Sequence, residues 1–202
     1  MKENSEYRAE SRQALKGNWN TSALFAFVYF LLASVISSAF SASFSFNDHL
    51  AFSAQLLGTF LVLPLEYGAY VAFLRFFRGE EIEIGWLFDG YRQQRIWTTS
   101  ILKYVYTILW SLLLIIPGII KSYSYAMTDY ILRDNPELKD NAAIELSMQM
   151  MQGYKMKLFL LHLSFLGWII LSILTLGIGL FWVIPYIYSA QAAFYEDLKQ
   201  NK

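Results

Sequence analysis

The stretch LWSLLLIIPGIIKSYSYA, Leu109–Ala126, places a Pro-Gly pair and then a lysine, Lys121, inside a long apolar run. A charge at the centre of a bilayer costs about 2.5–3.5 kcal/mol on insertion scales, so this lysine indicates a pocket, a partner or a nearby interface. The whole chain has the same character, because 56% of its 202 residues are hydrophobic and only 16% are charged. This composition favours a membrane protein over a soluble domain.

Two blocks of the chain, residues 21–74 and 158–198, contain no lysine or arginine. Each is long enough for two spans of about 20 residues. Clusters of lysine and arginine lie before, between and after the apolar blocks, and short basic loops stay in the cytoplasm. Each block is therefore expected to cross the membrane an even number of times. Residues 97–132 are long for one span and short for two, and the Pro117-Gly118 pair favours a kinked or re-entrant hairpin there.

The sequence thus predicts an all-α, polytopic transmembrane bundle of about six membrane segments with both termini in the cytoplasm. The predicted parts are a cytoplasmic amphipathic N-terminus (1–20), a first hairpin (21–74) joined by SFSFNDHL, a cytoplasmic loop (75–96), a broken second hairpin (97–132), an interfacial helix (133–157), a third hairpin (158–196) and a cytoplasmic tail (197–202).

A weak threefold repeat runs through these parts. Each unit begins with a polar or amphipathic segment that ends in a glycine: Gly17, Gly90 or Gly153. Each then carries a proline in its second half, followed by small and aromatic residues, as in Gly68–Tyr70, Ser122–Ser124 and Ser189–Gln191. The pattern predicts three units of interfacial helix plus hairpin. Helix breaks are expected at Pro64, Pro117, Gly118, Gly177, Gly179 and Pro185.

The segment between the second and third hairpins shows the amphipathic pattern most clearly. Asp134 or Asn135 is expected to cap a helix with Pro136 in its first turn. Its predicted apolar stripe is Leu138, Ala142, Leu146 and Met150, opposite Lys139, Asn141 and Glu145. The helix either lies on the inner membrane surface or packs on the rest of the protein, and both alternatives stay open at this point.

Several stretches resemble the bacterial membrane-protein family known as domain of unknown function 975, found largely in Gram-positive bacteria. They are LKGNW, FFRGEEI, LFDGY, LWSLLLIIPGIIKSYSYAM, YILRDNPEL, MMQGYK, LSFLGW, LTLGIGLFWVIPY and AFYEDL, and they run in order along nearly the whole chain. The family is also distantly similar to membrane domains fused to glycerophosphodiester phosphodiesterases. The resemblance implies a polytopic protein of the bacterial cell membrane in a lipid setting, and it implies no established activity.

The inventory of catalytic groups is small. The chain has no cysteine and only two histidines, His49 and His162, which do not have the spacing of a metal site. The glycines of LGIGL lack the Lys-Ser/Thr of a phosphate-binding loop. We therefore expect no enzymatic activity, no metal and no cofactor. Nucleic-acid binding is disfavoured because acidic residues lie beside the basic clusters.

The remaining candidates are four ionisable residues at apparent membrane depth: Glu66, Lys121, Asp129 and His162. Glu66 and Lys121 follow the prolines of two different repeats, so they are predicted to face each other in a polar pocket. In the alternative, Lys121 lies near a helix end and extends its ammonium to the interface.

Two functions fit these features. The first is a small transporter or a lipid- or peptide-handling protein. The second is a non-catalytic accessory, immunity or envelope-stress protein that acts by binding a protein or peptide. Expected partners are membrane lipids and either a second copy of the chain or another membrane protein.

Overall fold

The computed structural model describes residues 1–43, 48–138 and 140–201, without side-chain detail for 41–43 and 48–52. Part of the predicted SFSFNDHL connection, and Lys139, lie outside these residues. The described chain is helical and contains no β-strand. Its elements are α1 (Asn4–Leu15), α2 (Trp19–Ser43), α3 (Asp48–Phe77), the 3-10 helix η1 (Ile84–Arg92), α4 (Gln94–Leu113), α5 (Ile115–Tyr125), α6 (Thr128–Asp134), α7 (Asn141–Met150), α8 (Lys155–Leu163), α9 (Leu166–Leu174) and α10 (Leu180–Gln200).

Three stretches of the described chain are long and apolar enough to cross a membrane: Trp19–Phe40 in α2, Ser53–Phe77 in α3, and Lys155–Leu174 across α8 and α9. The six predicted segments are thus matched only in part. Helix α5 has 11 residues and rises about 16 Å at 1.5 Å per residue, which is roughly half of a bilayer core. The second unit is therefore a short hairpin.

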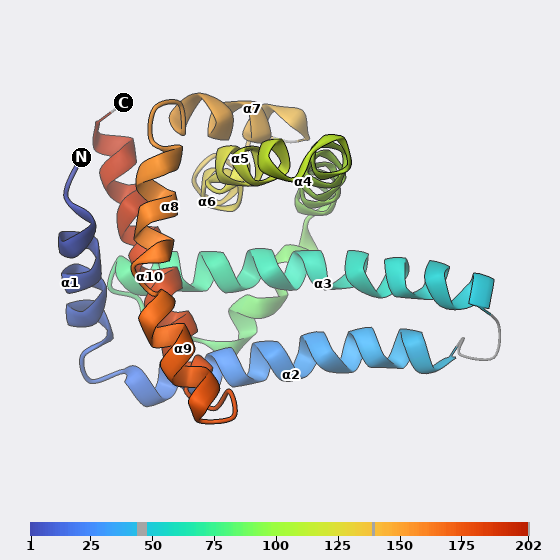
Figure 1. Cartoon of the computed structure of the whole chain (residues 1–202), viewed down its shortest axis with the longest axis horizontal. Helices are drawn as coiled ribbons and strands as arrows, with labels where there is room; N and C mark the ends of the chain where they lie inside the picture. Colours follow the sequence, from blue (N-terminus) through green and yellow to red (C-terminus); the bar gives the residue numbers. More distant parts are fainter. Residues whose placement is uncertain (44–47, 139, 202) are drawn as a thin grey trace.

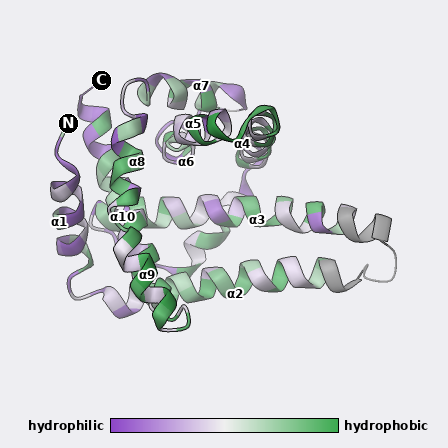
Figure 2. Ribbon diagram, in the orientation of Figure 1, coloured by the Kyte–Doolittle hydropathy of each residue, from purple (hydrophilic) through white to green (hydrophobic). Residues whose placement is uncertain are grey.

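The apolar units diverge from one end of the molecule. In Figure 1, α2 and α3 run side by side towards the right, whereas α9 descends from the end where both termini lie. Figure 2 shows that α2 and α9 are mainly hydrophobic, whereas α4 and α5 mix hydrophobic and hydrophilic residues. The corner between α4 and α5, Leu112–Ile116, is 67–77% exposed, and Leu176 between α9 and α10 is 95% exposed. Apolar tips this exposed are suited to lipid.

The helix breaks differ in part from the predicted positions. Helix α3 continues through Pro64, and α10 continues through Pro185. The chain does leave helical geometry at Leu114, whose φ and ψ are −161° and 141°, so Pro117 falls in the first turn of α5, where its missing N–H costs no helical bond. The chain leaves helical geometry again between α9 and α10, where Gly177 has a φ of +86°.

Segment η1 packs closely against α3 around Pro64. The Tyr91 hydroxyl donates a 2.6 Å hydrogen bond to the carbonyl of Leu61, in the turn before Pro64. A Cβ at Gly90 would overlap the backbone carbonyl of Pro64, so only glycine allows this close approach. The middle of the predicted cytoplasmic loop is therefore a short helix packed on a helix that is long and apolar enough to span a membrane.

The predicted interfacial helix begins later than expected. Asp134 is the last residue of α6, and α7 begins at Asn141. Its buried face is Ala143, Ile144, Ser147 and Met150, while Ala142 is exposed. The Ser147 hydroxyl donates to the Ser124 carbonyl at 2.8 Å and accepts from the Met127 N–H at 3.2 Å. These bonds turn the helix so that it packs on α4, α5 and α6.

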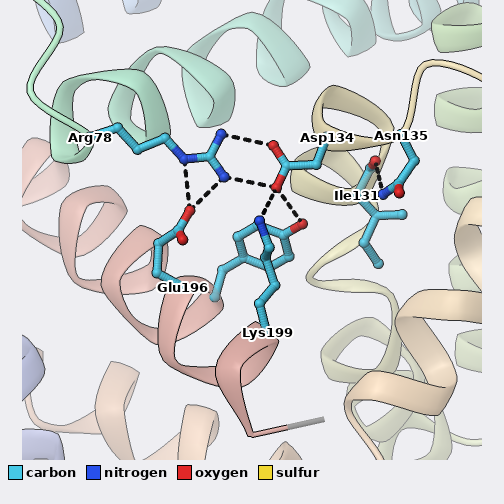
Figure 3. A network of polar contacts seen from close by, with 7 residues as sticks. Arg78, Ile131, Asp134, Asn135, Glu196 and Lys199 are labelled. Carbon is cyan, nitrogen blue, oxygen red and sulfur yellow. Dashed lines mark hydrogen bonds and ion pairs between the residues drawn. The ribbon is translucent and has the colours of Figure 1, made fainter.

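A network of charges joins the ends of three helices (Figure 3). The Asp134 carboxylate at the end of α6 accepts two 2.8 Å hydrogen bonds from the guanidinium of Arg78, which follows α3, and one of 2.7 Å from Lys199 of α10. Glu196 and Tyr195 of α10 complete the network. Burial alone raises the pKa of Asp134, but the bonds from Arg78 and Lys199 outweigh burial and lower its pKa to about 2.

This lowered pKa predicts an acid-sensitive stability. Asp134 is ionised in the folded protein at pH values where the unfolded chain binds a proton, so its contribution is complete above about pH 4 and is lost as the pH falls towards 2. Allowing for solvent screening, we expect Asp134→Asn to lower the free energy of unfolding by about 1–2 kcal/mol at neutral pH. The difference from wild type should shrink below pH 4.

Thermal unfolding in mild detergent between pH 2 and pH 7 measures this effect. The exposed Glu81 provides the control, because Glu81→Gln should leave the pH profile unchanged. A stability difference for Asp134→Asn that stays constant down to pH 2 would contradict the assignment.

Candidate functional site

A polar pocket of about 460 Å³ lies among α3, α4, α5, α6, α8 and α10. Its polar lining includes Glu66, Tyr70, Lys103, Asp129, His162 and Gln191. Leu63 and Ala126 supply apolar wall. Helix α3, which carries Glu66, is one of the three candidate spans, so the pocket places ionisable groups beside apolar membrane segments.

An ion pair between α4 and α6 forms one wall of the pocket. The Lys103 ammonium lies 2.5 Å from Oδ2 of Asp129. The Asp129 residue is only 3% exposed, and its second oxygen, Oδ1, has no hydrogen-bond partner. Separating the pair leaves a buried carboxylate without a countercharge, which is strongly destabilising. The pair therefore links α4 to α6 through their side chains and leaves one carboxylate oxygen without a hydrogen bond.

The second carboxylate of the pocket, Glu66, has no ion-pair or hydrogen-bond partner among the described residues. Lys103 and Asp129 are the charged groups that act on it electrostatically. Because the Lys103 ammonium is bonded to Asp129, the charge of Glu66 is not neutralised by a direct contact.

A chain of hydrogen-bonding groups forms another part of the lining. The amide N–H of Gln191 donates to the Ala126 carbonyl at 3.3 Å, so its Oε1 faces His162 Nε2 at 3.2 Å. The amide oxygen can only accept, so His162 Nε2 carries a proton, and Nδ1 lies 3.3 Å from the Tyr123 hydroxyl. This chain links α5, α8 and α10 around the pocket.

The three repeat units meet at this site. Tyr70, Tyr123 and Gln191 each lie six residues after the proline of their own unit, at 64, 117 and 185, and all three line the pocket. Equivalent positions of the repeat therefore converge on one cavity, although the units differ in helix length.

Three of the four predicted site residues lie in the pocket: Glu66, Asp129 and His162. Lys121 lies elsewhere, with Nζ 4.7 Å from the Trp110 ring centroid and 3.9 Å from Met148 Sδ. The predicted pairing of Glu66 with Lys121 is therefore replaced by a pocket that contains Lys103. The physical reason is that Lys121 finds an aromatic face and a thioether on the outside of the short hairpin, whereas Lys103 points inward at Asp129.

Sequence patterning alone does not single out Lys103, because it follows the first apolar block together with four arginines. Its position ten residues into α4, about 13 Å from the helix start, is the signal that separates it from them. Within the part of the chain that the structure describes, no three Asp, Glu or His side chains gather as metal ligands do. The chemistry that these residues offer is hydrogen bonding, charge and proton exchange.

Comparison with known proteins places the chain in a family. The family model described as "Protein of unknown function (DUF975)" matches residues 1–120 and 99–202, which together cover the chain. The chain belongs to the DUF975 family. No curated protein and no solved structure matches it. For this DUF975 protein, the distant similarity to membrane domains of glycerophosphodiester phosphodiesterases stays a prediction.

The ion pair makes the DUF975 protein sensitive to loss of its pocket lysine. Lys103→Met removes the countercharge of a buried carboxylate, and we expect it to lower the free energy of unfolding by about 3–5 kcal/mol. Lys121→Met removes contacts with an aromatic ring and a thioether and should cost about 1 kcal/mol or less. Unfolding by a graded denaturing detergent compares the two variants. Equal losses, or no recovery when Asp129→Asn is added to Lys103→Met, would refute the pairing.

Proposed function

We propose that this DUF975 protein is a small multi-pass protein of the bacterial cell membrane that binds a small polar or amphiphilic molecule in its pocket and serves in transport or lipid or peptide handling. The proposal rests on one observation: ionisable side chains line a cavity that is bordered by helices apolar enough to span a membrane. Ionisable groups at membrane depth are costly, and they usually mark a ligand or ion pathway.

The pocket has the size and lining of a ligand site. Its volume of about 460 Å³ lies within the roughly 300–1,000 Å³ of small-molecule sites. Short and interrupted helices border it, as α5 and α6 do, and such segments are typical of the binding regions of membrane transporters. The exposed apolar tips of the three units surround this centre with surface suited to lipid, which supports exchange of a ligand between membrane and water.

The proposal includes the orientation of the protein in the membrane, with both termini in the cytoplasm. The amino group of Met1 lies 3.3 Å from Asn201 Oδ1, and the Lys2 N–H donates to Asp197 at 2.8 Å. Termini held together lie on the same side of a membrane, which fits an even number of crossings. The positions of the basic clusters assign that side to the cytoplasm.

Cysteine labelling tests the orientation without background, because the natural chain has no cysteine. A cysteine at Asn47, between α2 and α3, should react with a membrane-impermeant thiol reagent in intact cells. A cysteine at the exposed Gln93 should react only after the cells are permeabilised. The reverse pattern would place the termini outside.

Native mass spectrometry of the protein released gently from its own membrane tests ligand binding. We expect wild type to retain a small molecule and Thr107→Trp, which fills the pocket, to lose it. Lys121→Met, outside the pocket, is the matched control and should retain it. A wild-type protein that is bare, or that carries only another protein, would overturn the proposal and favour an accessory protein.

A further inference from the structure

We propose that the pocket recognises its ligand through a positively charged ammonium group held between the carboxylates of Glu66 and Asp129. This inference rests on the proposed function, because it names the chemical class of the molecule that the pocket takes. The ammonium belongs either to a free amine or to the headgroup of a lipid.

The charges that line the pocket favour a cation. Two carboxylates, Glu66 and Asp129, line the pocket together with one ammonium, Lys103, and that ammonium is bonded to Asp129. The Glu66 carboxyl group therefore has no cationic partner in the pocket. In surroundings of low dielectric constant, a bound cation gains more from a carboxylate than it does in water.

The carboxylate oxygens that accept no hydrogen bond also favour a cationic ligand. Only 3% of the surface of Asp129 is exposed, yet its Oδ1 accepts no hydrogen bond. Glu66 likewise has no donor among the described side chains. Ionised carboxylates only accept hydrogen bonds, and an ammonium group supplies up to three donors. An anionic ligand would instead have to compete with Asp129 for Lys103.

The remaining walls suit an organic cation rather than a bare metal ion. Four tyrosines, Tyr70, Tyr104, Tyr123 and Tyr125, line the pocket, and aromatic faces attract cations. Leu63 and Ala126 offer apolar surface for a carbon chain attached to the nitrogen. The combination of carboxylates, aromatic rings and an apolar side matches an amphiphilic amine.

Calorimetric titration of the protein in nanodiscs of phosphatidylcholine, with octylamine as the probe, tests the inference for a soluble source. Octanoate and octanol have the same chain length and carry a negative charge or none. We expect octylamine to bind at least tenfold more tightly than either. Glu66→Gln should weaken octylamine binding at least tenfold, which corresponds to 1.4 kcal/mol. Glu66→Asp, which keeps the carboxyl group, should bind octylamine within about threefold of wild type. Lys121→Met, outside the pocket, should do the same.

A second arm tests the lipid source. The protein in nanodiscs that contain equal amounts of phosphatidylethanolamine and phosphatidylglycerol is released and weighed by native mass spectrometry. Preferential retention of phosphatidylethanolamine that is lost in Glu66→Gln assigns the ammonium to a lipid. Binding of octylamine alone assigns it to a free amine.

Three results would overturn the inference. The first is that octanoate or phosphatidylglycerol binds best. The second is that Glu66→Gln folds like wild type and binds amines equally well, and the third is that neither octylamine nor phosphatidylethanolamine binds. The first result leaves the proposed function intact, because the pocket would still hold a small molecule, but one of the opposite charge. A bare protein in the native-membrane experiment is the separate result that removes the proposed function itself.

Discussion

The ion pair between Lys103 and Asp129 is the constraint on which the rest of the structure depends. A lysine and an aspartate among apolar helices cost much less when each neutralises the other, because an isolated buried charge costs several kcal/mol. The pair therefore links α4 to α6 through their side chains. The hydrogen-bond chain through His162 fixes α5, α8 and α10 around the same space. The ion pair and the hydrogen-bond chain both line the pocket.

The distribution of polarity follows from this centre. Charged and hydrogen-bonded groups lie in the pocket and in the network around Asp134 at the ends of α3, α6 and α10 (Figure 3). The outer ends of the three units carry exposed leucine and isoleucine side chains. The network clamps the helices at one end, and the apolar units diverge from it (Figures 1 and 2).

Much of the architecture was predictable from the sequence, and the reasons are physical. The lysine-free block of residues 21–74 predicts the α2–α3 hairpin, because only apolar helices satisfy their backbone in lipid. The small and aromatic residues after each repeat proline do meet in space. Pro64 did not reveal that α3 is continuous, because the segment that packs around it, η1, follows later in the sequence and its contacts cannot be read from local spacing. The start of α7 was misplaced because Asp134 serves a long-range ion pair instead of a cap.

The candidate site was predictable to a similar extent. Glu66, Asp129 and His162 stood out as ionisable residues in apolar surroundings, and all three line the pocket. The choice between Lys103 and Lys121 required knowledge of where each helix begins and which face it buries. Sequence spacing alone did not contain that information, because α5 is short and turns Lys121 towards Trp110. The charge of the pocket could therefore be deduced only after its lysine was identified.

The pairing of Lys103 with Asp129 and the ligand site beside it are tested most directly by electron cryomicroscopy of the protein in a lipid nanodisc, at a resolution that shows side chains. We expect Lys103 within hydrogen-bond distance of Asp129 and density for a bound molecule in the space between Asp129 and Glu66. A structure in which Lys103 faces lipid or water, with the pocket closed by its own side chains, would contradict both expectations.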